Sequence, residues 1–134
     1  MNNKGLMIII VLFVIIIVYS IYNSYINSNN EGYKKITFEE MYKIINKSNS
    51  NDYVVLDVRT NEEYNESRIP GSILIPDYEI NKAENIISNK EQVIFVYCRS
   101  GRRSKGAVLN LIKMGYAKIY DVGGIIDYPY DLEN

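Results

Sequence analysis

The stretch from Gln92 to Met114 constrains the fold of this chain more than any other. It begins with a short apolar run, Gln92–Tyr97, whose β-branched and aromatic residues are typical of a strand buried on both faces. It ends with Lys105–Met114, in which apolar residues recur at helical spacing. The seven residues 98–104 between them therefore form a strand-to-helix loop.

Cys98, the only cysteine of the chain, stands at the mouth of this loop. The unpaired N–H groups and the positive dipole end of the following helix favour a thiolate there. Three of the five arginines, Arg99, Arg102 and Arg103, lie in the same loop. We therefore expect an anion to dock over an ionised sulfur that solvent can reach. A buried core thiol is the alternative interpretation, and the surrounding arginines favour a functional one.

The small number of cysteines and the lack of histidine exclude several kinds of functional site. One cysteine excludes an internal disulfide and a multi-cysteine metal site, and the absence of histidine removes both the other common metal ligand and a Cys–His pair. We expect no metal and no cofactor. A net charge of −1, without a basic stripe outside the loop, gives no reason to expect nucleic acid as a partner.

The N-terminal part predicts a membrane anchor. Residues 1–4 are polar, and residues 5–22 form an apolar segment long enough to span most of a bilayer. A cleaved signal peptide is the alternative, but the segment lacks a small-residue cleavage site. Residues 23–32 are rich in Asn and Ser and indicate a linker to a domain at 33–134. Lys4 predicts a cytoplasmic N-terminus and an extracytoplasmic domain.

Apolar runs and helical patterns alternate along residues 33–134. Capping boxes at Thr37/Glu40 and Thr60/Glu63 open two helices, and a third helical pattern covers residues 79–88. Short apolar runs predict strands at 34–37, 53–58, 72–75, 92–97 and 119–122, and Gly123-Gly124 predicts a turn. This alternation indicates a parallel sheet with helices on both faces, whose ligands bind beyond the carboxyl ends of the strands. Cys98 and Arg59 follow two such ends.

The loop motif Cys98-Arg99-x-Gly101-x-Arg103 resembles the active-site loop of the rhodanese (sulfurtransferase) family. Cysteine-dependent phosphatases carry one residue more between Cys and Arg, and that spacing reaches Ser104 here, so the loop resembles one sized for sulfane sulfur. Two further blocks, 56–64 with 68–73 and the Gly123-Gly124-Ile125 turn, also resemble the family. Family members often carry His where Arg68 stands.

The resemblance covers nearly all of residues 33–132. It implies a three-layer α/β/α fold with a five-stranded parallel sheet, and Cys98 as the persulfide carrier. Family members often carry a tryptophan where Tyr128 stands. The substrate-binding residues that we predict are those of the loop together with the arginine at the neighbouring rim: Arg99, Ser100, Gly101, Arg102, Arg103, Ser104 and Arg59. Solvated charges that raise the local potential are the alternative for Arg99 and Arg102. Asp57 is expected to order the turn around Arg59, which is itself open between a structural ion pair and an anion contact.

The sequence therefore predicts a membrane-anchored sulfurtransferase. Its Cys98 would take sulfur from thiosulfate or a persulfide, both small sulfur-containing anions, and pass it to cyanide or a thiol, with a protein acceptor as one option. A non-catalytic binding module or a redox sensor that uses the same loop is the first alternative. Phosphatase or arsenate-reductase chemistry is a weaker one.

Overall fold

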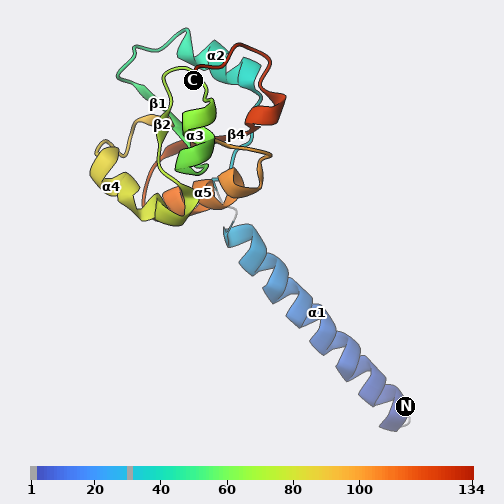
Figure 1. Cartoon of the computed structure of the whole chain (residues 1–134). Coiled ribbons are helices and arrows are strands. Elements are labelled where there is room, and N and C mark those ends of the chain that lie inside the picture. Colours follow the sequence, from blue (N-terminus) through green and yellow to red (C-terminus); the bar gives the residue numbers. More distant parts are fainter. Residues whose placement is uncertain (1–2, 30–31) are drawn as a thin grey trace. The chain divides into compact units, whose positions relative to one another are not determined.

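A computed structural model of the chain describes residues 3–29 and 32–134, which form two compact units. The first is helix α1, Asn3–Asn29 (Figure 1). Its part Asn3–Tyr25 is long and apolar enough to cross a membrane, a test that a signal sequence also passes. The helix continues beyond residue 22, so residues 23–29 of the predicted linker are helical. Residues 1, 2, 30 and 31 lie outside the described part.

The second unit contains a parallel sheet of four strands in the order β2-β1-β3-β4. The strands are β1 Tyr53–Asp57, β2 Ile73–Leu74, β3 Val93–Cys98 and β4 Lys118–Gly124. The predicted count of five is wrong for the described residues. The segment 34–37 pairs with β4 only through one bridge, Lys35 with Asp121, because the chain turns into helix α2 directly afterwards.

Helices cover both faces of the sheet, which confirms the three-layer prediction. The helical elements are α2 Phe38–Ile45, α3 Asn61–Glu66, the 3₁₀ helices η1 Asp77–Lys82 and η2 Ile125–Asp127, α4 Ala83–Ile86 and α5 Arg102–Lys113. Alternate residues of β3 face opposite ways. Ile94, Val96 and Cys98 belong to the core under α4 and α5, whereas Phe95 and Tyr97 belong to the core under α2.

Both predicted capping boxes are present at the starts of α2 and α3. The helix predicted over residues 79–88 is instead split into η1 and α4, with a non-helical Glu79. Ile80, Ala83 and Ile87 still reach the core. A spacing of three residues suits a 3₁₀ turn as well as an α-helix, so the apolar pattern could not tell the two apart.

Glu63 ties α3 to the start of α5. Its carboxylate accepts a hydrogen bond from the Thr60 N–H at 3.0 Å, and it binds both terminal nitrogens of Arg103 at 2.7 and 2.8 Å. The Arg103 hydrogen bonds lower the pKa of Glu63 to about 2. This two-pronged pair holds the first turn of α5 in place relative to the turn after β1.

The glycine pair at the end of β4 stays in the sheet, contrary to the predicted turn. Gly123 pairs with Tyr97 and Gly124 with Cys98, after a register shift between Val96 and Tyr97. Gly123 has φ +88°, a conformation that glycine adopts without strain. A Cβ on Gly124 would lie 2.6 Å from the Cα of Ser100. The backbone of β4 therefore runs directly against the loop after Cys98.

We expect Gly124→Ala to lower the free energy of unfolding by about 2 kcal/mol, since the methyl group meets backbone atoms of the loop that cannot move aside independently. Gly106→Ala is the matched control, because a Cβ there meets nothing within 4 Å and the residue lies inside α5. It should raise stability by about 0.5–1 kcal/mol. Denaturant unfolding of the purified chain measures both, and equal stability of the two variants would contradict the close approach.

Candidate active site

Cys98 is the last residue of β3, and its sulfur lies beneath the loop that follows. The residue is 1% exposed. The Gly101 N–H donates to the Cys98 Sγ across 3.0 Å, a bond that strengthens when the sulfur carries negative charge. The expectation of a solvent-accessible thiol is therefore wrong, because the loop folds back over the sulfur.

Gly101 is the N-cap of α5 and has φ +95°, in the left-handed region. It supplies no capping side chain, and none of the described residues makes a side-chain cap at this helix end. The first-turn N–H groups of α5 therefore keep their hydrogen-bonding capacity beside the loop, where the helix dipole is positive. A Cβ on Gly101 would also approach the Cα of Gly123 at 3.6 Å.

The three loop arginines have different surroundings. Arg99 and Arg102 are exposed, and no salt bridge involves either of them in the part of the chain that the structure describes. Arg103 is half-buried and paired with Glu63. The hydrogen bonds to the Glu63 carboxylate raise the pKa of the Arg103 guanidinium. Arg102 and Arg103 line a cavity of about 280 Å³ together with Asp77 and Asn110. Ser100 is exposed and lines a second cavity, of about 340 Å³, beside Gly124.

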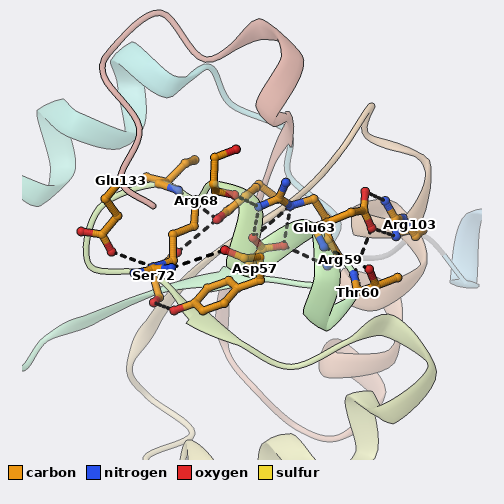
Figure 2. Close-up of polar contacts among 12 residues, drawn as sticks. Asp57, Arg59, Thr60, Glu63, Arg68, Ser72, Arg103 and Glu133 are labelled. Carbon is orange, nitrogen blue, oxygen red and sulfur yellow. Dashed lines mark hydrogen bonds and ion pairs between the residues drawn. The ribbon is translucent and has the colours of Figure 1, made fainter.

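Arg59 lies in a structural ion pair. Its guanidinium binds Asp57 with an Nη2–Oδ2 distance of 2.7 Å and donates to the Ser67 carbonyl at 2.6 Å. The Arg59 N–H also donates to Asp57 Oδ1 at 2.9 Å, which orders the turn. Figure 2 shows this pair beside Glu63 and Arg103. With 5% of its side chain exposed, Arg59 forms the structural ion pair, one of the two roles left open for it, and the anion contact stays a prediction.

Ser104 also has its hydroxyl engaged inside the protein. It is fully buried, and its hydroxyl lies 2.7 Å from Asp121 Oδ1 and 3.1 Å from the Gly101 carbonyl oxygen. The hydroxyl therefore contacts both the loop and β4, and the substrate contact predicted for Ser104 stays a prediction. Arg68, at the rim, binds Glu133 at 2.9 Å and lies over the ring of Tyr64.

Two residues near the loop were missed by sequence reasoning. Glu63 was recognised as a capping residue, but its pairing with Arg103 joins positions 40 apart in the chain. Asp121 carried no signal beyond its position in a strand, and only the pairing of β4 with β3 brings it under the loop.

Comparison with known protein families matches residues 37–127 to the rhodanese-like domain. The chain is 40% identical over 68 residues to the putative sulfur carrier protein YrkF of Bacillus subtilis, covering 51% of this chain and 36% of that one. It is 34% identical over 73 residues to the thiosulfate sulfurtransferase PspE of Escherichia coli, covering 54% of this chain and 70% of the relative. The chain thus spans about a third of the length of YrkF.

Solved structures agree with the sequence comparisons. A rhodanese with anions from Escherichia coli matches with a TM-score of 0.58 at 30% identity, covering 61% of this chain and 98% of that one. A rhodanese-related protein from Thermoplasma volcanium matches with a TM-score of 0.62 at 31% identity, over 75% and 98% of the two chains. Since the family match extends over more than half of its length, this chain belongs to the rhodanese-like sulfurtransferase family, as its loop motif predicted.

Proposed function

We propose that Cys98 carries sulfane sulfur as a persulfide between a small anionic donor and an external acceptor. The main observation is that the Gly101 N–H donates to the Cys98 Sγ beside the uncapped N-terminus of α5. This hydrogen bond and the positive end of the helix dipole both favour a negative charge on the sulfur. Family membership supports it, and the thiosulfate sulfurtransferase PspE is among the relatives.

The proposed reaction has two steps, sulfur uptake by Cys98 and sulfur release to an acceptor. The Cys98 thiolate attacks the outer sulfur of thiosulfate, so that a new S–S bond forms while the donor's own S–S bond breaks and sulfite leaves with the electron pair. Cyanide or a thiolate then attacks the terminal sulfur and restores the Cys98 thiolate, giving thiocyanate or a new persulfide. The chain has one cysteine, so the acceptor is another molecule. A protein thiol is one such acceptor.

The burial of Cys98 affects how both an oxidant and a sulfur donor would reach the sulfur. A redox sensor needs a thiolate that oxidants reach easily, and a residue exposed by 1% restricts an oxidant and a sulfur donor alike. A sulfur donor must also displace part of the loop 99–101 to reach the Sγ. We infer that donor entry involves a shift of this loop, whose exposed members Arg99 and Ser100 face outward.

Incubation of the purified chain with thiosulfate should add one sulfur atom to Cys98, visible as a mass gain that a reducing agent reverses. Cys98→Ser should gain nothing, because the chain contains no other thiol. Intact-mass spectrometry measures both. Folded wild-type protein without the gain would reject the carrier role and leave the non-catalytic binding module in its place.

Arg99 and Arg102 are the proposed attractors of the donor, since Arg103 and Arg59 are already paired. We expect Arg102→Gln to raise the KM for thiosulfate by about threefold to tenfold at low salt, with the effect shrinking as salt screens the charge. Lys43→Gln removes an exposed cation from α2, where it pairs with Glu39, and is the control. Steady-state kinetics at two ionic strengths measures the difference, and identical KM changes in the two variants would contradict local attraction.

Helix α1 is the proposed single-pass membrane anchor, with the domain on the extracytoplasmic side. The support is the exposed apolar surface of Asn3–Tyr25 and the position of Lys4 at the N-terminal end of this segment. Placing the only thiol on the exposed residue 113, in Cys98→Ser/Lys113→Cys, should give labelling by a membrane-impermeant maleimide in intact cells. Labelling only after lysis would place the domain in the cytoplasm, and a mature chain that lacks residues 5–22 by mass would identify a cleaved signal instead.

A further inference from the structure

The cavity of about 280 Å³ beside the loop is lined by groups of opposite charge from two elements. Arg102 and Arg103 belong to the first turn of α5, Asn110 lies two turns further along the same helix, and Asp77 is the first residue of η1. Pockets that hold small organic molecules begin at about 300 Å³. The cavity is therefore large enough for a small organic ligand as well as for an inorganic anion.

The opposite charges in this cavity are not paired with each other. Asp77 is half-buried, and in the described part of the chain its carboxylate has no hydrogen bond and no ion pair. Arg102 is exposed and also lacks an ion pair there, whereas Arg103 is occupied by Glu63. A simple anion in the cavity is attracted by Arg102 but repelled by Asp77. A ligand with both a carboxylate and an ammonium group finds a partner for each of its charges.

The cavity lies close to the reactive sulfur. Asp77 follows β2 and Cys98 ends β3, so both lie at the carboxyl edge of the parallel sheet, and α5 packs against η1. The hydrogen bonds to Glu63 raise the pKa of the Arg103 guanidinium most. The negative charges of Cys98 and Asp77 raise the pKa of that guanidinium further, so both groups lie near it. A ligand in the cavity is therefore next to the loop that covers the sulfur.

We propose that this cavity binds the zwitterionic amino-acid group of a small thiol such as L-cysteine, which accepts the sulfur carried by Cys98. The carboxylate of the ligand faces Arg102, its ammonium group faces Asp77, and the Asn110 amide offers both a donor and an acceptor. The proposal rests on the role of Cys98 as sulfur carrier and names the class of acceptor.

The transfer step follows from this placement. The thiol of the ligand loses its proton to solvent, and the resulting thiolate attacks the terminal sulfur of the Cys98 persulfide. A new S–S bond forms to the ligand, while the bond between the Cys98 Sγ and the terminal sulfur breaks and leaves its electron pair on Cys98 as the thiolate. The product is the persulfide of L-cysteine. Sulfite leaves before the acceptor binds, so Arg102 serves the donor and the acceptor in turn.

Binding is tested without sulfur transfer in full-length Cys98→Ser in detergent micelles, since this variant contains no thiol. The ligands are L-cysteine, 3-mercaptopropionate, which lacks the ammonium group, and cysteamine, which lacks the carboxylate. NMR titration follows the backbone amides of α5 and the side-chain amide of Asn110. We expect L-cysteine to bind about threefold to fivefold more tightly than either analogue, as for one exposed ion pair. Equal affinities, or no saturable binding of L-cysteine, would overturn the proposal.

Asp77→Asn separates recognition of the ammonium group from a structural role of the carboxylate. In steady-state sulfur transfer, the KM for L-cysteine should rise by about threefold to fivefold. The KM values for 3-mercaptopropionate and thiosulfate should fall, because a negative charge that repels them is removed. A structural defect would move all three KM values in one direction. Changes of the same sign for L-cysteine and 3-mercaptopropionate, or an unchanged KM for L-cysteine, would refute the assignment of Asp77.

Two further variants complete the test. Glu79→Gln removes a carboxylate from the same helix outside the cavity, where it pairs with Lys82, and should change none of these KM values. Gly106→Leu fills the cavity without changing its charge, since Gly106 lines it and a Cβ there meets nothing within 4 Å. In the Cys98→Ser background it should abolish the preference for L-cysteine over the two analogues, and a retained preference would place the ligand elsewhere and overturn the proposal.

Failure of the carrier role and failure of this inference give different results. If Cys98 does not carry sulfur, the wild type forms no persulfide with thiosulfate, while the binding comparison in Cys98→Ser is unaffected. If the cavity does not recognise the amino-acid group, the persulfide forms normally and the three thiols bind Cys98→Ser with equal affinity.

Discussion

The close approach of β4 to the loop after Cys98 is the constraint on which the site depends. Gly124 pairs with Cys98 in the sheet and leaves no room for a Cβ against Ser100. Because β4 supplies this flat backbone surface, the loop can fold back within three residues and bring the Gly101 N–H to the sulfur. The same surface explains why the sulfur is enclosed rather than open to solvent.

The arginines around the loop are of two kinds: some form buried or half-buried ion pairs, and others lie on the surface without one. Arg59 and Arg103 each bind a carboxylate in a two-pronged geometry, with Asp57 and Glu63 respectively. The Asp57 pair orders the turn after β1, and the Glu63 pair connects α3 to the start of α5, the helix end beside the sulfur. Arg99 and Arg102 remain on the surface, where they raise the local potential for an incoming anion. The burial of a charge thus separates arginines that hold the site together from those that can attract a donor.

Much of the fold followed from local patterns. The apolar run before Cys98 and the capping boxes at Thr37 and Thr60 predicted a strand and two helix starts that the structure contains. Such signals are short-range, since strand burial and capping depend on residues a few positions apart. The predictions of an edge strand at 34–37 and of one helix over 79–88 were wrong. Tertiary contacts set how far a segment pairs with the sheet and whether a turn is 3₁₀ or α.

The sequence by itself determined the family and the position of the loop, and it predicted Cys98 as the nucleophile, because the spacing of Cys98, Gly101 and Arg103 is local information. Tertiary structure alone decided which of the described arginines lack an ion pair, how deeply the sulfur lies, and that the Ser104 hydroxyl lies against Asp121. Those outcomes depend on pairs such as Glu63 with Arg103 and Ser104 with Asp121, which are 40 and 17 positions apart. No local pattern records such a distance, since only the packing of strands and helices brings those side chains together.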